Sequence, residues 1–281
     1  MTKRIAFGWY GGKYSHLDWL LPQLPATTHY CEPFGGSAAV LINRVPVPVE
    51  TYNDIHGEVV NFFRVLRDQK DALIEAIGLT PFAREEFQQA ISESKQELSN
   101  LERARQFYVL ARQVRTGLAQ KASSGRWAHC LLTSRAGMAG AVSRWLGAVE
   151  DLPLIAQRLL RVQIEHDTAL NVIQRYDSPE TLFYCDPPYP HDSRSDINAY
   201  AHEMTDNDHI NLAETLHSVQ GKVALSSYDS KLYRDLYSDW HCIVGPTKII
   251  NSAKTMRTEL LWVNYEAVEV RRLTKHKQMQ L

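Results

Sequence analysis

Short apolar runs alternate with amphipathic stretches in the first 68 residues of the chain. Residues 29–32 and 49–54 are each predicted as a short strand, and each is followed by a segment predicted as a helix, at 37–43 and 57–67. Strands that alternate with helices in this order are typical of a parallel sheet covered by helices. We therefore predict a β–α–β–α arrangement for this region.

The same alternation returns from about residue 166. A buried strand is expected at 182–185, followed by an amphipathic helix at 206–219 with Thr205 or Asp206 as its N-cap. The remaining apolar runs predict further strands at 222–226, 240–244 and 259–265. Both ends of the chain therefore predict parts of one α/β fold.

Strand signals fade between residues 69 and 165, where apolar residues recur with helical spacing. The segment from Arg103 to Gly147 carries eight Lys and Arg residues and no Asp or Glu, whereas the segment before it is rich in acids. This asymmetry favours a polyanionic partner, although a solvated basic face would produce it too. We predict one domain formed by 1–68 and 166–281, and an inserted, mainly helical subdomain at 69–165.

The overall composition is that of an ordinary globular protein, with 44% hydrophobic and 22% charged residues and a formal net charge of -1. The four cysteines are far apart and form no Cys-x-x-Cys pair, which indicates reduced thiols rather than disulfides or a zinc site. We expect Cys185 in the core and His209 on a solvated helix face. The chain shows no signal peptide and no apolar membrane span, so we expect a cytoplasmic protein.

Asp186-Pro187-Pro188-Tyr189 is the most distinctive segment for chemistry, because it directly follows the apolar run at 182–185. The prolines have no N–H, which leaves backbone carbonyls to accept hydrogen bonds from a ligand. An acceptor-only carboxylate and an aromatic ring stand beside them. Such a set suits the exocyclic amino group of a nucleobase. A proline-rich turn after a core strand is the alternative interpretation.

Two glycine segments precede this one. Trp9-Tyr10-Gly11-Gly12-Lys13 lies near the N-terminus, and Glu32-Pro33-Phe34-Gly35-Gly36-Ser37 connects the first expected strand to the first expected helix. Asp54 follows the second segment by about eighteen positions, where an acid can bond the ribose hydroxyls of an adenosine-type cofactor. A turn or a helix cap explains Asp54 alone equally well. Glycine loop and acid together favour a nucleoside site.

In this order, the segments resemble the Dam-type (D12 class, α-group) DNA adenine N6-methyltransferases. The resemblance rests on WYGGK at 9–13, EPFGGS at 32–37, YNDI at 52–55 and CDPPY at 185–189, and continues weakly into LSSYD at 225–229 and RTELL at 257–261. It implies a Rossmann-like, S-adenosylmethionine-dependent methyltransferase sheet in the catalytic domain, and a target-recognition role for the inserted helical subdomain. The arginine- and asparagine-rich recognition loop of GATC-specific members is not found.

The resemblance also implies a role for single residues. Asp54 looks like the ribose ligand, and Tyr189 looks like the ring that stacks on a flipped base. The catalytic set is Asp186, Pro187, Pro188 and Tyr189, with the Pro187 carbonyl accepting from the adenine amine. The cofactor set is Trp9, Tyr10, Gly12, Lys13, Glu32, Pro33, Phe34, Gly35, Asp54 and Asp186. The candidate DNA contacts are Arg112, Arg115, Lys121, Arg126, Trp127 and Arg135.

The function that the resemblance implies is methyl transfer from S-adenosylmethionine to a flipped adenine at a specific site in double-stranded DNA, without a metal. We expect a monomer or a weak dimer, and a cognate restriction endonuclease is a candidate partner. Two alternatives stay open: an RNA adenine or DNA cytosine N4 methyltransferase, and a catalytically silent DNA-binding regulator. Another nucleotide-binding α/β protein is the least specific alternative.

Overall fold

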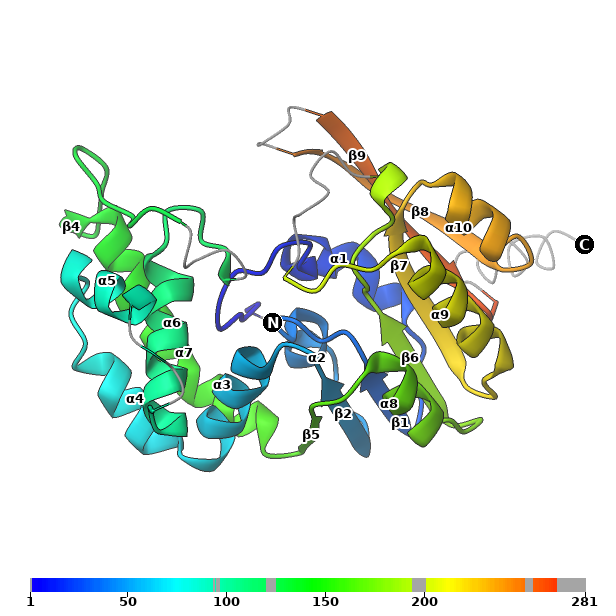
Figure 1. Ribbon diagram of the computed structural model, residues 1–281, viewed down its shortest axis with the longest axis horizontal. Helices are drawn as coiled ribbons and strands as arrows, with labels where there is room; N and C mark the ends of the chain where they lie inside the picture. The colour runs from blue at the N-terminus through cyan, green and yellow to red at the C-terminus, as the bar shows by residue number, and fades with distance from the viewer. Residues whose placement is uncertain are drawn as a thin grey trace, which may run out of the picture. The chain divides into compact units, whose positions relative to one another are not determined.

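The computed structural model describes residues 2–92, 94, 97–119, 125–193, 201–250 and 255–266 (Figure 1). The chain divides into two compact units. The first unit comprises Met1–Tyr14, Gly36–Asn43 and Asp54–His166, and the second comprises Ser15–Gly35, Arg44–Asn53 and Asp167–Leu281. Our division into 1–68 with 166–281 and an insert at 69–165 draws these boundaries differently and stays a prediction.

One sheet has the strand order β5-β2-β1-β6-β7-β9-β8. Its strands are β1 (His29–Glu32), β2 (Val49–Asn53), β5 (Val162–Glu165), β6 (Thr181–Cys185), β7 (Lys222–Tyr228), β8 (His241–Ile250) and β9 (Thr255–Val263). β1 pairs in parallel with β2 and β6, and β6 pairs in parallel with β7. β9 runs antiparallel to β7 and β8. This mostly parallel sheet with its helices confirms the predicted α/β class.

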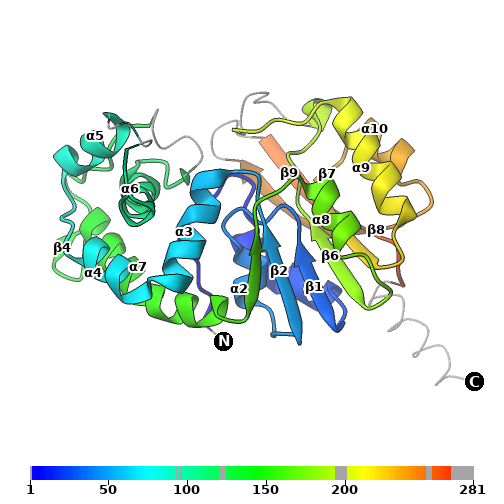
Figure 2. The same ribbon diagram turned by 60° about the horizontal axis from the view of Figure 1, so that its bottom comes forward.

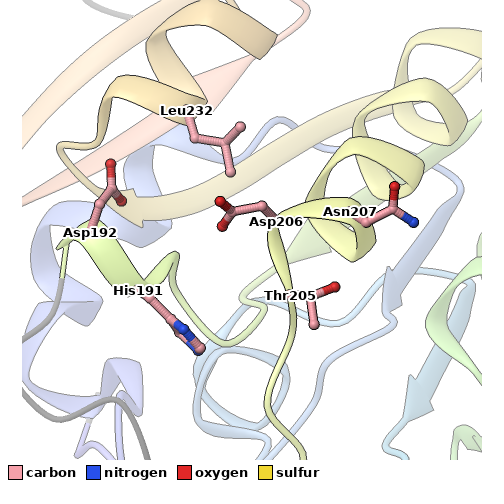
Figure 3. Close-up of a pocket in the computed structure, with 6 residues that line it drawn as sticks. All are labelled: His191, Asp192, Thr205, Asp206, Asn207 and Leu232. Atoms are coloured by element: carbon pink, nitrogen blue, oxygen red, sulfur yellow. The ribbon is translucent and has the colours of Figure 1, made fainter.

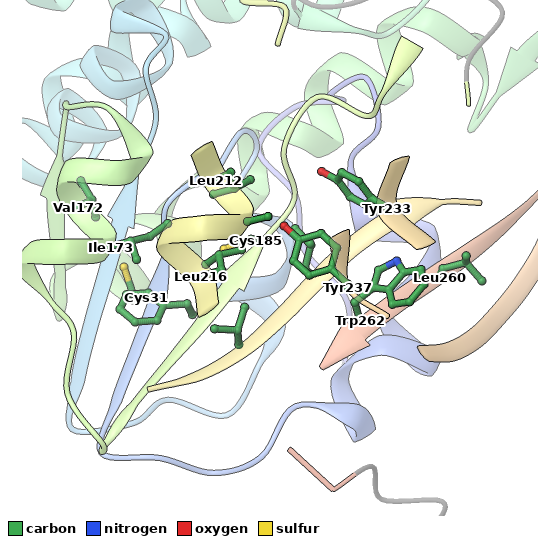
Figure 4. Packing of buried hydrophobic residues seen from close by; sticks show 14 residues of the cluster. Cys31, Val172, Ile173, Cys185, Leu212, Leu216, Tyr233, Tyr237, Leu260 and Trp262 are labelled. Carbon is green, nitrogen blue, oxygen red and sulfur yellow. The ribbon is translucent and has the colours of Figure 1, made fainter. Parts of the chain in front are cut away.

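The core of the second unit lies beneath helices α8 (Ala169–Arg175), α9 (Asp206–Ser218) and α10 (Lys231–Leu236), which cover one face of its strands (Figures 1 and 2). Buried side chains from these helices and from β1, β6, β7 and β9 form one cluster (Figure 4). All of β6 is buried, which explains its continuous apolar sequence. Short helical segments lie at Lys13–His16, Leu17–Leu20 (α1), Leu21–Gln23 and His191–Ser193.

The first unit is mainly helical, as predicted for most of its length. Its helices are α2 (Ala39–Asn43), α3 (Gly57–Asp68), α4 (Lys70–Gly78), α5 (Arg84–Ser92), α6 (Asn100–Gln113) and α7 (Gly140–Leu159). Phe7, Phe62, Phe63 and Phe107 pack around one centre, with ring centroids between 5.0 and 5.6 Å apart. A hairpin of β3 (Ser134–Arg135) and β4 (Met138–Ala139) was not predicted, because two-residue strands show no periodicity.

Three short elements and one side chain differ from the sequence-based expectation. β5, α8 and α10 were missed, because segments of four, seven and six residues complete too few periods to be recognised. The expectation that His209 is solvated is wrong: the residue is fully buried, and its Nδ1 lies 3.0 Å from the Tyr233 hydroxyl. The burial of Cys185 and the Thr205 N-cap of α9 are confirmed.

Candidate active site and nucleic-acid interface

The carboxyl ends of the parallel strands β1, β2 and β6 lie along one edge of the sheet. The loop after β1 is tied to the end of β2, because the Gly35 N–H donates to the Asn53 carbonyl (2.8 Å) and the Asn53 side chain donates to the Pro33 carbonyl (2.8 Å). A Cβ on Gly35 would lie 2.1 Å from the Tyr52 ring, so only glycine fits. This loop thus lies where open α/β sheets bind their ligands.

Glu32, the last residue of β1, is buried and accepts a hydrogen bond from the Tyr30 hydroxyl at 2.6 Å. Burial and the negative charge of Glu32 raise the pKa of Tyr30 well above its ordinary value. The Arg44 guanidinium lies 3.7 Å from the centre of the Tyr30 ring. Phe34, expected to line a cofactor pocket, is half-buried and packs against the core cluster of the second unit.

Four residues of the two glycine segments and Asp54 lie in the first unit and form a cluster. We name it the glycine–tryptophan cluster: Trp9, Gly12, Lys13, Gly36 and Asp54. The Gly12 N–H closes a turn by donating to the Trp9 carbonyl at 3.1 Å. A Cβ on Gly36 would lie 2.6 Å from the Trp9 indole, and the φ angle of Gly36 is +50°. Close approach and left-handed backbone therefore both require glycine at this position.

Asp54 holds the backbone of this cluster in place. Its carboxylate accepts the Gly36 N–H (2.7 Å) through Oδ2 and the His56 N–H (2.7 Å) through Oδ1. Lys13 is buried, and its ammonium group donates to the Gly11 carbonyl at 2.6 Å. Asp54 thus orders both the glycine loop and the turn after β2, and its contact with a ribose stays a prediction.

We expect Gly36→Ala to destabilise the protein by at least about 2 kcal/mol, because the added Cβ collides with Trp9 on a left-handed backbone. Urea unfolding measures the change. Gly147→Ala is the matched control: it lies in α7 with nothing within 4 Å of the new Cβ, and alanine should stabilise the helix by about 0.5–1 kcal/mol. Equal stability of the Gly36→Ala variant and the wild type would contradict the packing described here.

The Asp186 segment begins directly after β6. Asp186 and Pro188 are half-buried, and Pro187 and Tyr189 are buried. The Tyr189 hydroxyl donates to the Glu259 carboxylate at 2.5 Å. The Tyr228 ring meets the Tyr189 ring edge-on, with centroids 4.7 Å apart and planes at 79°. These contacts fix the orientation of the Tyr189 ring, and its stacking on a base stays a prediction.

Negative charge gathers around this segment. Burial, and after it the charge of Asp186, raises the pKa of Tyr184, Cys185 and Tyr189 above their ordinary values. Glu259 adds to the effect at both tyrosines. An electronegative edge favours N–H donors and cations. A nucleobase amine and a positively charged cofactor both meet this condition.

Two of the eight basic residues in the acid-free stretch are neutralised within the fold. Arg103 forms an ion pair with Glu58, and Arg105 pairs with Glu86 (3.0 Å) and Glu102 (2.6 Å). These pairs join α6 to α3 and α5 and stabilise the helical packing. The basic face that a polyanion could use is therefore smaller than the residue count predicts.

The side chains of Arg115 and Arg126 are both exposed. The two residues are neighbours, because the Arg115 N–H donates to the Arg126 carbonyl at 2.7 Å. Within the described residues, neither side chain has an acidic partner. Trp127 packs its indole 5.2 Å from the Phe82 ring and donates to the Gln113 side chain at 3.1 Å. Trp127 therefore anchors the loop that carries the two arginines.

Other candidate DNA contacts lie on α6 and in the β3–β4 hairpin. Arg112 is half-buried and lies 3.4 Å from a backbone carbonyl of α7, whereas Arg135 is exposed in β3. Leu131 and Leu132, just before the hairpin, expose 88% and 95% of their surface. Lys121 lies outside the described residues.

A pocket of about 480 Å³ lies between the short helix His191–Ser193, the start of α9 and α10 (Figure 3). It is lined by His191, Asp192, Thr205, Asp206, Asn207 and Leu232. None of the predicted cofactor or catalytic residues lines it. Among the residues that the structure describes, no group of three His, Cys, Asp or Glu side chains could hold a metal ion. No helix in the same part of the chain is long and apolar enough to cross a membrane.

Several residues that the structure brings to these sites were not predicted from the sequence. Gly36 was left out of the cofactor set, although its place in a glycine pair was a usable signal. Glu259 was not singled out, because nothing local connects it to Tyr189, 70 positions away. Leu131 and Leu132 could have been noticed as an apolar pair in an otherwise polar and basic stretch.

Comparison with known proteins shows the family of this chain. Residues 9–258 match the family model of the D12 class N6 adenine-specific DNA methyltransferases, a range that contains all predicted site residues. The chain is also 25% identical over 284 residues to the type II methyltransferase M1.LlaDCHI of Lactococcus lactis subsp. cremoris. The aligned region covers 92% of this chain and 94% of that protein. The chain therefore belongs to the D12 class of N6 adenine-specific DNA methyltransferases.

Proposed function

We propose that this methyltransferase acts at a specific DNA sequence and uses S-adenosylmethionine to methylate N6 of an adenine flipped out of the duplex. The observation that carries the proposal is the place of Asp186, which follows the buried strand β6 at an electronegative edge and precedes two prolines. A relative that matches over most of its length is a type II methyltransferase, which supports action at a specific sequence. A cognate restriction endonuclease is therefore the candidate partner.

The residues present fit an adenosine-type cofactor that carries positive charge. The Gly36 backbone lies against Trp9 with no room for a side chain, and Asp54 is the acid expected to bind a ribose. The charges of Glu32 and Asp186 complement a sulfonium and an amino group. We assign the cofactor contacts to Trp9, Tyr10, Gly12, Lys13, Glu32, Pro33, Phe34, Gly35, Asp54 and Asp186.

When bound, S-adenosylmethionine supplies an electrophilic methyl group. Adenine N6 is a poor nucleophile, because its lone pair is delocalised into the ring. The Asp186 carboxylate and the Pro187 carbonyl would each accept a hydrogen bond from the amine, which favours a more tetrahedral nitrogen whose lone pair points outward. Pro187 has no N–H that could compete for this lone pair. Asp186 also provides the acceptor for the proton that the amine loses.

The role that we propose for Tyr189 is to stack on the flipped base, which would recover roughly 1–3 kcal/mol of the cost of flipping. In this structure the ring is only 2% exposed. A base that stacks on it must therefore displace the side chains that cover it, while the hydroxyl keeps the ring in one orientation.

We propose that the exposed basic residues of the first unit bind the DNA backbone. Replacing Arg115 and Arg126 with Gln should weaken DNA binding and reduce the slope of log affinity against log salt by about one for each phosphate that is no longer neutralised. Fluorescence anisotropy at several salt concentrations measures both effects. Lys70→Gln, on α4 outside the acid-free stretch, is the control and should leave the slope unchanged. An unchanged slope in the arginine variant would show that DNA binds elsewhere.

The proposed reaction is tested by incubating the protein with labelled S-adenosylmethionine and, in parallel, unmodified duplex DNA or RNA, then identifying the modified nucleoside by mass spectrometry. N6-Methyladenine at one recurring sequence is the expected product. Methylated RNA only, or N4-methylcytosine, would replace the proposed substrate. Failure to bind the cofactor would favour a catalytically silent DNA-binding protein.

A further inference from the structure

Glu259 is a buried acid of the second unit that has no role in the proposed mechanism. Glu259 lies in β9, directly opposite Tyr228 of β7 in the antiparallel pairing, and only 2% of its surface is exposed. A carboxylate is costly to bury unless hydrogen bonds compensate its lost hydration. Tyr228 is the last residue of β7, so its partner Glu259 lies beside the sheet edge that carries Asp186.

The Glu259 carboxylate holds Tyr189 by its hydroxyl. The hydroxyl donates to Glu259 Oε1 at 2.5 Å, and the ring meets Tyr228 edge-on at 4.7 Å. Burial raises the pKa of Tyr189 well above its ordinary value, so the hydroxyl keeps its proton and remains a donor. Tyr189 is therefore fixed at its tip and at its edge.

The backbone between Tyr189 and Asp186 transmits this restraint. Two consecutive prolines, Pro187 and Pro188, each lock one φ angle, so the four-residue segment has few remaining degrees of freedom. A displacement of Tyr189 as a whole is therefore carried along the backbone to the Pro187 carbonyl and Asp186. These are the two acceptors proposed for the adenine amine.

We propose that Glu259 is a positioning residue for methyl transfer: by holding the Tyr189 hydroxyl, it sets the geometry of the Asp186–Tyr189 segment. This inference rests on the proposed function of that segment. A misplacement of about 1 Å at a reacting group can lower a rate roughly 100-fold, so a positioning contact affects the chemical step. A contact that only stabilises the fold changes the fraction of active enzyme instead.

The test compares Glu259→Gln, Tyr189→Phe and the double variant under single turnover, with enzyme in excess over DNA and saturating S-adenosylmethionine. The rate constant then reports the methyl-transfer step, whereas the amplitude reports the active fraction. We expect each single variant to slow the rate constant by roughly 10- to 100-fold and to keep the wild-type cofactor affinity. The double variant should be no slower than the slower single variant, because residues that act as a unit are not additive.

Tyr233→Phe is the matched control, since it also removes a buried tyrosine hydroxyl that has a buried partner, His209, at 3.0 Å. Its rate constant should equal that of the wild type. A wild-type rate constant for Glu259→Gln, or effects that multiply in the double variant, would overturn the inference.

Two further outcomes are separated by the same experiment. If Glu259→Gln does not fold, Tyr189→Phe alone decides, and a wild-type rate constant for it overturns the inference. If the wild-type enzyme forms no N6-methyladenine, the proposed function itself fails, and the inference fails with it.

Discussion

Replacing Asp186 with alanine is expected to slow methyl transfer by at least roughly 1,000-fold while DNA binding persists. The variant loses a hydrogen bond to the amine and the acceptor for its proton, and each such loss costs a large factor in rate. The carboxylate is a negative charge, so its removal should leave the affinity for a polyanion unchanged or slightly higher. Single-turnover methylation and anisotropy binding together measure the two effects.

Asp192→Ala is the control for this experiment. Asp192 lies six residues further along the chain, in the short helix His191–Ser193, is exposed and accepts a hydrogen bond from the Lys231 N–H at 3.3 Å. We expect its rate to stay close to that of the wild type. If Asp186→Ala retained near-normal turnover, the amine would have to be held by other groups, and the proposed mechanism would be wrong.

Asp54→Ala is expected to weaken cofactor binding by roughly 10- to 100-fold. The substitution removes the acceptor for the Gly36 and His56 N–H groups, both 2.7 Å away, and removes the proposed ribose ligand as well. Hydrogen bonds to charged groups contribute about 1.5–3 kcal/mol each, which gives this range. Isothermal titration calorimetry with S-adenosylmethionine measures the affinity directly.

A comparison of two further variants shows which function of Asp54 matters. Asp54→Asn keeps the size and one oxygen acceptor but not the charge, and should fall between wild type and alanine. Asp68→Ala removes an exposed acid of the same unit that pairs with its neighbour Arg67, and should bind the cofactor normally. Unchanged affinity in Asp54→Ala would refute the proposed ribose contact.

Local sequence patterns were sufficient to predict the strands and loops that carry the motifs. The continuous apolar run of β6 predicted a buried strand, and the strand–helix order around β1 and β2 predicted a covered parallel sheet, which the structure shows. The order of the motifs along the chain predicted the methyltransferase family, which the family match confirms. Patterns of this kind depend only on residues that are close in the sequence, so they can be recognised before the fold is known.

The periodicity of the sequence did not predict the burial or pairing of side chains whose neighbours come from distant segments. His209 occupies a polar stretch of α9, yet it is buried against Tyr233 of α10. Arg103 and Arg105 counted as candidate cations, yet they pair with acids from α3, α5 and their own helix. Burial and ion pairing depend on helix packing, which the charge pattern of one segment does not reveal.

The sequence by itself determined the fold class, the family and the segments that we propose carry the chemistry, because strand periods, glycine pairs and consecutive prolines are local properties of the chain. Only the tertiary structure decided how these segments are held. It brought Glu259 to the Tyr189 hydroxyl across 70 positions and set the Gly36 backbone against Trp9. Such contacts arise when strand pairing and loop closure bring remote residues together, and no local pattern encodes their geometry.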